Sequence, residues 1–397
     1  MAKLDFLPEQ WAVKRLGEIA KFRTGPFGSA LHKSDYVSDG VPVINPMHIV
    51  DGRIEPTAQM TISEELAVRL TDFRLMDGEI VIGRRGDMGR CAVVHANQAG
   101  WLCGTGSMII RLHGQADVDF LQRVLSSPRA ISAIVGASVG TTMVNLNQET
   151  LAGLCVQFPP LEEQRAIAST LSDMDAMLGG LKRLIAKKND LKQAAMQQLL
   201  TGKIRLSGRS GGWRRKQLHE LSTMKSGNSI TGTDIDQFSR YPCYGGNGLR
   251  GYTSRFTHDG TYALIGRQGA LCGNVFGVEG QFFASEHAIV VTPFVDTDIK
   301  WLTYALARMN LNQYSESSAQ PGLSVAKVLK LELSAPPTRD EQTAIASALE
   351  DMDAELSVLE QRLAKTHDLK QAVIQELLTG RTRLVAADVA ATEVAHA

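Results

Sequence analysis

The sequence is poor in cysteine, and no cysteines stand at metal-binding spacing. The five present are odd in number and form no Cys-x-x-Cys pair: Cys91, Cys103, Cys155, Cys243 and Cys272. This pattern predicts free thiols in a reducing cytoplasm and no structural zinc site. The nine histidines are scattered without ligand spacing, so no metal site is expected.

Long apolar runs are also missing. No run of about 18 apolar residues occurs, so the sequence predicts no membrane-spanning helix. The start, MAKLDFLPEQ, lacks the apolar segment of a signal peptide. We therefore expect a cytoplasmic protein without a membrane partner.

Motifs for catalysis or cofactor binding are absent. Gly104-Thr-Gly106 lacks the third glycine of a dinucleotide-binding loop, and no GxxxxGK[ST] phosphate-binding loop occurs. Asn45-Pro-Met-His48 superficially resembles the Asn-Pro-Pro-aromatic site of amino-methyltransferases, but it lacks the second proline and the aromatic residue. The sequence predicts a chain that is not an enzyme by itself and binds no cofactor.

The net charge is zero, with 42 basic and 42 acidic side chains. A neutral total gives no support for a nucleic-acid-binding face. The distribution is uneven, however: residues 207–335 carry 13 basic and 10 acidic side chains, whereas residues 336–397 carry 6 and 11. The acidic end therefore masks a mildly basic middle.

What the sequence does contain is an internal duplication. Residues 163–206 and 341–384 align without a gap at an offset of 178, with 27 identities in 44 positions. In both copies apolar residues recur at intervals of three and four, which is typical of a coiled coil. The expected seam residues are Ile167, Leu171, Met174, Leu178, Leu181, Ile185, Leu191, Ala195 and Leu199, and Ile345, Leu349, Met352, Leu356, Leu359, Leu363, Leu369, Val373 and Leu377.

Both expected helices have start and stop signals. Pro160 and Pro337 suit helix starts, and Gly202 and Gly380 suit the left-handed position that follows a helix end. The apolar spacing breaks at the same place in both copies, around Lys187 and Lys365, which predicts a shared stutter. About 40 residues at about 1.5 Å each make a rod of roughly 60 Å.

The intervals before each helix are degenerate copies of one another. Trp11 and Trp213 open similar segments, and VIGRRG and LIGRQG follow later in each interval. Strand-like runs dominate both intervals, with one short helical pattern in each, which predicts an α+β fold. The predicted organisation is domain, helix, domain, helix and frayed tail, at residues 1–158, 159–206, 207–335, 336–385 and 386–397.

Glycine-rich turns carry the candidate binding residues. Glycine allows a backbone to approach a ligand closely, and an adjacent arginine can bind phosphate or guanine. The alternative is that these turns are only tight hairpins with solvated arginines. The candidate DNA-binding residues are Arg23, Lys33, His48, Arg84, Arg85, Arg90, Lys225, Asn228, Asn247, Arg250, Arg267, Gln268 and His287.

These features together resemble the specificity subunit of a type I DNA restriction–modification system. The resemblance rests on the duplicated Pro-Pro and Glu-Gln-x-x-Ile-Ala helix starts, the LLTGKIRL and LLTGRTRL ends, and the Gly212-Trp213 opening of the second domain. The first domain departs from that opening, with Gln10 before Trp11. The resemblance covers all but the tail.

The resemblance implies a fold, a function and partners. It implies two target recognition domains held by an antiparallel pair of long helices, each domain reading half of a split double-stranded DNA target. It also implies two modification subunits, which carry S-adenosylmethionine and methylate adenine, and restriction subunits that use ATP with Mg. An orphan or decoy specificity subunit and a coiled-coil adaptor that binds no DNA are the alternatives.

Overall fold

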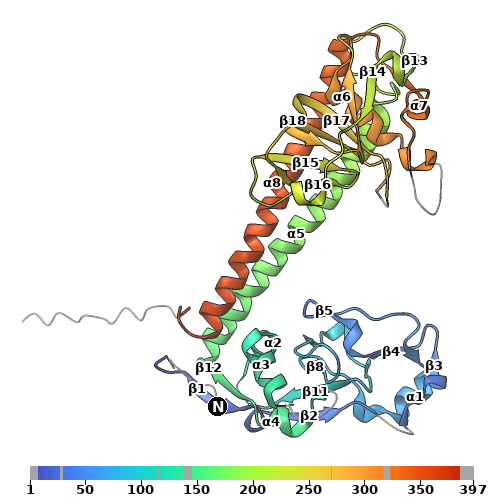
Figure 1. Cartoon of the computed structure of the whole chain (residues 1–397). Coiled ribbons are helices and arrows are strands. Elements are labelled where there is room, and N and C mark those ends of the chain that lie inside the picture. Colours follow the sequence, from blue (N-terminus) through green and yellow to red (C-terminus); the bar gives the residue numbers. More distant parts are fainter. Residues whose placement is uncertain are drawn as a thin grey trace, which may run out of the picture. The chain divides into compact units, whose positions relative to one another are not determined.

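The chain folds into two compact units. Unit 1 comprises Met1–Gly179 and Ala364–Ala397, and unit 2 comprises Gly180–Leu363. The structure is a computed structural model and describes residues 8–26, 30–114, 116–137, 145–269, 271–315 and 322–384 (Figure 1). The predicted tail at 386–397 lies outside the described residues, and the predicted segment boundaries stay a prediction.

Unit 1 is built on a four-stranded antiparallel sheet in the order β2-β11-β8-β9. Its strands are β2 (Ala20–Thr24), β11 (Ser107–Leu112), β8 (Ile80–Gly83) and β9 (Cys91–Val93). Ile80 and Ile82 belong to one core cluster and Val81 to another, so this sheet is buried on both faces. Burial on both faces explains why strand β8 is continuously apolar in sequence.

The other described strands of unit 1 form three further sheets. A four-stranded sheet has the order β10-β4-β7-β3, in which β10 and β4 are parallel. Its members are β10 (Leu102–Cys103), β4 (Val41–Ile44), β7 (Thr61–Ile62) and β3 (Tyr36–Val37). Two-stranded sheets pair β1 (Ala12–Arg15) with β12 (Cys155–Phe158), and β5 (Ile49–Val50) with β6 (Arg53–Ile54). The short helices are α1 (Glu64–Arg69), α2 (Val118–Leu125), α3 (Pro128–Ala137) and α4 (Gln148–Ala152).

Unit 2 repeats this plan around a six-stranded sheet in the order β14-β19-β17-β18-β15-β16. The strands are β14 (Ser222–Ser226), β19 (Ala288–Pro293), β17 (His258–Gly266), β18 (Val275–Ala284), β15 (Tyr241–Gly245) and β16 (Gly248–Thr253). A separate pair joins β13 (Arg214–Gln217) to β20 (Glu332–Ala335). The short helices are α6 (Ile299–Arg308) and α7 (Val325–Val328).

The same strand order in both units confirms the predicted degenerate repeat. The antiparallel series β2-β11-β8-β9 in unit 1 matches β14-β19-β17-β18 in unit 2. The helix after this series is capped alike, because Asp117 accepts from Phe120 N and Asp298 accepts from Trp301 N, each at 2.9 Å. The α+β fold with two similar domains is therefore as predicted.

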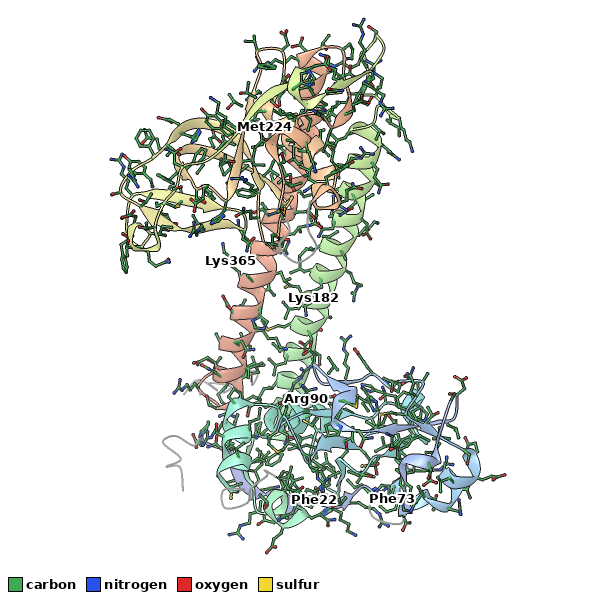
Figure 2. All side chains as sticks on the ribbon, turned by 45° about the vertical axis from the view of Figure 1, so that its right-hand side comes forward. Phe22, Phe73, Arg90, Lys182, Met224 and Lys365 are labelled. Carbon is green, nitrogen blue, oxygen red and sulfur yellow. The ribbon has the colours of Figure 1, made fainter. Side chains whose placement is uncertain are left out.

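Each repeat continues into a long helix, α5 (Leu161–Leu199) or α8 (Arg339–Leu378). The helices are antiparallel, since Asp175 pairs with Lys370 within unit 1 and Lys192 pairs with Asp353 within unit 2 (Figures 1 and 2). Gly202 and Gly380 have φ of 72° and 69°, which confirms the left-handed position after each helix. Helix α8 starts after Pro337, where the Thr338 hydroxyl accepts from Glu341 N at 3.3 Å.

The predicted stutter is wrong. Leu191 and Leu369 are 48% and 58% exposed, so they do not lie on the seam. The unbroken four–three spacing from Leu181 and Ile185 instead continues to Lys188 and Lys192 in α5. The corresponding positions in α8 are Thr366, which is buried, and Lys370. The apolar pattern gave a false break because polar residues hold two seam positions in each copy, where a lysine stem can cover apolar surface.

The Glu-Gln pair that recurs at each helix start is buried and structural. Glu163 is ion-paired to Arg383 at 2.7 Å and accepts a hydrogen bond from the Trp11 indole at 3.1 Å. In unit 2, Glu341 makes the matching contacts to Arg205 at 2.7 Å and to Trp213 at 3.3 Å. Each glutamate therefore binds both an arginine and the tryptophan that opens the domain, and its hydrogen bond raises the pKa of the arginine. We call these groups the glutamate clamps.

Within the described residues, no helix combines the length and the apolar character needed to cross a bilayer.

Candidate nucleic-acid interface

The two predicted glycine–arginine turns are equivalent in three dimensions. Arg84 directly follows β8 and donates its backbone N–H to Gly106 O at 2.9 Å, as Arg267 after β17 donates to His287 O at 2.8 Å. A later segment then crosses each turn in the same way. Leu146 N donates to Arg84 O, and Leu323 N donates to Arg267 O, both at 2.9 Å.

A second glycine turn packs beside each of them. Gly25 N donates to Ser107 O and Gly227 N donates to Ala288 O, both at 3.0 Å. A Cβ on Gly25 would lie 2.0 Å from Gly104 O, so only glycine permits this approach. We define cluster 1 as residues 25–26, 84–86 and 104–106, and cluster 2 as residues 227–230, 245–247, 266–269 and 284–288.

Among the described residues, the arginines of cluster 1 have no partner that neutralises their charge. Arg84 is half-buried and Arg85 is exposed, and neither side chain makes a hydrogen bond or ion pair within the described part of the chain. Burial, and then the charge of Arg85, lower the pKa of Arg84. Two adjacent cations without a carboxylate are suited to an anionic ligand such as a phosphate or the acceptor edge of guanine.

Cluster 2 presents a more polar surface. The Nδ1 of His287 lies 3.0 Å from Gln268 Oε1, and its Nε2 lies 3.3 Å from Glu286 Oε1. Within the described ranges, the Arg267 guanidinium reaches only a backbone oxygen, Glu286 O, at 3.5 Å. Because amide and imidazole groups donate and accept hydrogen bonds, this surface can contact base edges as well as phosphates.

The other candidates of unit 2 lie in cluster 2 or next to it. Asn228, whose backbone N–H donates to Ala284 O at 2.9 Å, and Asn247 are exposed. The Arg250 side chain lies over Gly245, because a Cβ built there would be 2.5 Å from Arg250 Cδ. Lys225 is exposed on β14. The structure therefore gathers these residues, and their contact with DNA stays a prediction.

Four candidate DNA-binding residues of unit 1 lie outside cluster 1. His48 is 1% exposed, with its Nδ1 accepting from Asn45 N and its Nε2 near the Thr57 hydroxyl, so its prediction as a surface contact is wrong. Burial lowers the pKa of His48, which keeps the ring neutral. The sequence could not reveal this, because the ring is buried by segments distant along the chain.

The other three are exposed or engaged elsewhere. Arg23 pairs with Asp72, and its guanidinium carbon lies 5.0 Å from the centre of the Phe73 ring, which is labelled in Figure 2. Arg90 pairs with Asp87, three residues earlier. Lys33 is exposed on a short 3-10 turn.

Asn45, rejected above as a catalytic residue, holds cluster 1 together. Its side-chain oxygen accepts from Gly106 N at 3.1 Å, and Pro46 packs where a Cβ on Gly83 would lie. No group of three or more metal-ligating side chains occurs in the described ranges.

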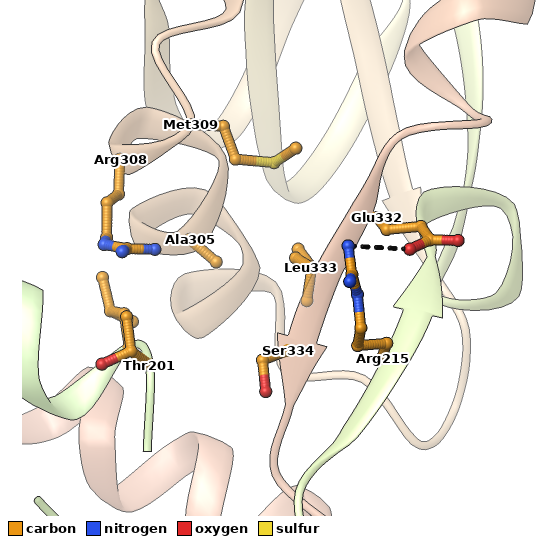
Figure 3. A pocket seen from close by; sticks show the side chains of 9 residues that line it. Thr201, Arg215, Ala305, Arg308, Met309, Glu332, Leu333 and Ser334 are labelled. Atoms are coloured by element: carbon orange, nitrogen blue, oxygen red, sulfur yellow. Dashed lines mark ion pairs between the residues drawn. The ribbon is translucent and has the colours of Figure 1, made fainter. Parts of the chain in front are cut away.

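A pocket of unit 2 lies away from both clusters. This pocket, of ≈ 370 Å³, is bounded on one side by Arg308 at the end of α6 and the following Met309, and on the other by Leu333 and the Arg215–Glu332 ion pair (Figure 3). The 3.0 Å pair already satisfies its own charges, and the candidate residues do not line this pocket. Its position gives no support for a small-molecule substrate.

Comparison with known proteins assigns both repeats to one family. The family model described as the type I restriction modification DNA specificity domain matches residues 8–193 and 210–366. The chain is 46% identical over 144 residues to the EcoprrI specificity subunit of Escherichia coli, which is 35% of this chain and 36% of that protein. It is 24% identical over 201 residues to the MjaVIII specificity subunit of Methanocaldococcus jannaschii, or 49% of this chain and 43% of that protein.

These matches span less than half of the length of the curated relatives. Solved structures match almost the whole chain. The S subunit from M. genitalium has a TM-score of 0.64 at 18% identity and covers 95% of this chain and 99% of its own. The HsdS subunit from Thermoanaerobacter tengcongensis has a TM-score of 0.51 at 18% identity, covering 96% and 100%. At this identity the likeness shows the fold.

The family model spans two stretches that begin just before Trp11 and Trp213 and end within the two long helices, so it follows the same repeat that the sheets and loop clusters display. This chain, with its duplicated domains and paired helices, belongs to the type I restriction–modification DNA specificity family.

Proposed function

We propose that the chain is the sequence-specific DNA-recognition subunit of a type I restriction–modification complex. The observation that carries this proposal is the pair of equivalent loop clusters, each presenting, beside its glycine turns, arginine that makes no ion pair with a carboxylate among the described residues. Each cluster would read one half of a bipartite target.

The duplication suits a bipartite duplex target. Two similar readers in one chain match the two half-sites of such a target. Arginine side chains bind phosphates without regard to sequence, and they bind guanine edges with specificity. A neutral chain can do both where its cations are concentrated on loops.

Partner subunits would supply the chemistry. Two modification subunits carrying S-adenosylmethionine would methylate adenine at N6, and restriction subunits would use ATP and Mg. The names of the curated relatives, each a type I restriction enzyme specificity subunit, support this assignment. A chain at 18% identity and TM-score 0.59, from a study of complex assembly of the type I system, shares this fold.

The reading roles are tested by single arginine substitutions. Duplexes selected from a random library by the wild-type chain with its modification subunits define the target. Arg85→Ala should relax only the half-site read by unit 1, and Arg267→Ala only the other, at a cost of about 1–3 kcal/mol each. Arg165→Ala and Arg308→Ala, on helices, serve as controls. If both cluster variants select the wild-type target with full affinity, the turns are structural.

The division of labour is tested by methyl transfer from radiolabelled S-adenosylmethionine. The purified chain alone should transfer none to target DNA, and addition of the modification subunit should restore transfer. An adaptor that does not bind DNA would fail to enrich any duplex in the selection. An orphan subunit would enrich a duplex in the selection, but no gene for a cognate methyltransferase would lie beside its own gene.

A further inference from the structure

The side chain of Phe238 stands in solvent, 95% exposed, on the loop between β14 and β15. An exposed apolar side chain is common on protein surfaces and alone indicates no function. Phe238 differs because its backbone is fixed and because arginine and aromatic side chains lie near it.

Asp236 fixes the turn that carries Phe238. Its Oδ1 accepts from Phe238 N at 2.7 Å and from Ser239 N at 2.6 Å, and its Oδ2 accepts from the Ser239 hydroxyl at 2.6 Å. The Asp236 backbone pairs with Tyr252 of β16 through two 2.8 Å hydrogen bonds. The ring is therefore held out from the sheet by a pre-organised turn.

Cations and further aromatic rings lie next to this turn. The Arg240 guanidinium carbon is 5.3 Å from the Tyr241 ring centre, and Tyr241 lies 5.0 Å from Phe256, which is 44% exposed. Arg255 is also exposed and approaches Asp234 at 3.8 Å. Interleaved cationic and aromatic side chains are the combination that binds nucleic acid through both phosphates and bases.

This surface is continuous with cluster 2. The loop carrying Phe238 leaves cluster 2 at Ile230, whose N–H donates to Glu286 Oε2 at 3.3 Å. Strand β16 also links the two, because its Arg250 lies over Gly245 of cluster 2 and a Cβ on the next residue, Gly251, would lie 2.8 Å from Asp236 O. A duplex bound at cluster 2 would therefore lie close to the Phe238 turn.

We propose that Phe238 inserts its ring at a base step of the duplex beside the half-site read by unit 2. This inference rests on the proposed function. An apolar wedge unstacks one step and bends the duplex, and the bend allows adjacent cations to contact more phosphates. Because flexible pyrimidine–purine steps unstack at lower cost, Phe238 would add specificity without a hydrogen bond to any base.

The test uses the full chain with its modification subunits and the duplex selected by the wild type. Replacing each adenine of either strand in turn by its analogue 2-aminopurine reports unstacking as increased fluorescence. The wild type should give an increase at one step beside the unit 2 half-site. Phe238→Ala should abolish it and weaken binding about tenfold, the loss expected for one stacked base, whereas Phe238→Trp should retain both.

Two controls separate insertion from charge and from misfolding. Phe294→Ala removes a 43% exposed ring just after the far end of β19 and should behave as the wild type. Phe238→Ala should leave the salt dependence of binding unchanged, whereas Arg240→Ala should reduce its slope by about one.

The outcomes are distinguishable. If the wild type selects no duplex, the proposed function fails and this inference falls with it. If the wild type selects a target but Phe238→Ala keeps the fluorescence signal and the affinity, only the insertion is overturned.

Discussion

At the residue scale, the glutamate clamps show how a recurring motif can be structural. Glu163 and Glu341 are the acidic residues of the Glu-Gln pairs, and their side chains are 0% and 1% exposed. Gln164 continues the same task, because its side chain accepts from Asp117 N at 2.9 Å and donates to Pro159 O at 2.8 Å. These side chains join each helix start to the domain before it and to the end of the other helix.

Removing a clamp should destabilise its unit. Glu163→Ala leaves the Trp11 indole and Arg383 without their shared acceptor, and we expect a loss of about 1–3 kcal/mol in the free energy of unfolding. Urea unfolding followed by circular dichroism measures this. The exposed neighbour variant Glu162→Ala should stay within about 0.5 kcal/mol of the wild type. Equal midpoints for both variants would contradict the structural role.

At the element scale, the long helices combine apolar and charged seam positions. Ile167 and Leu171 pack with Leu377 in one core cluster of unit 1, and Ile345 and Leu349 pack in a core cluster of unit 2. Between them, Lys370 bonds Asp175, and Asp175 also pairs with Arg123 of α2 at 2.5 Å. Charged seam positions favour one register, because a shifted helix would separate the partners.

The corrected seam makes a direct prediction for two leucines of α5. Leu171 is fully buried, so Leu171→Ala should cost about 2–5 kcal/mol of stability. Leu191 is about half exposed, so Leu191→Ala should cost less than about 1 kcal/mol. Thermal unfolding of both variants compares them on the same helix. If Leu191→Ala lost more stability than Leu171→Ala, Leu191 would belong to the seam and the predicted stutter would be correct.

At the scale of the whole molecule, both long helices run from one compact unit into the other. Helices of 39 and 40 residues extend for roughly 60 Å at about 1.5 Å per residue. We expect their length to set the number of base pairs that neither unit reads.

Inserting one heptad into each helix, after Lys187 and after Lys365, tests this. The insertions preserve the seam and lengthen each helix by about 10 Å. At about 3.4 Å per base pair, the unread gap should grow by about three base pairs while both half-sites remain. Methylation-site mapping of the reconstituted complex measures the gap. A folded, active insertion variant with the original gap would show that other contacts set the spacing.

The duplication, the α+β class and the ends of the long helices follow from sequence alone. These features are local or repeated, so glycine after a helix, proline before one and apolar spacing are enough to predict them. The glycine–arginine turns were also predictable, because the same short motif recurs at equivalent positions.

Tertiary structure decided the rest. The sequence could not place His48 in the interior, because distant segments bury it and satisfy its ring. Nor could the sequence place Lys192 on the seam, since Asp353, with which Lys192 forms an ion pair, lies 161 residues away. The exposure of Phe238 likewise depends on how its loop crosses β16. Burial and charge pairing arise from residues far apart in the chain, and only the folded chain brings them together.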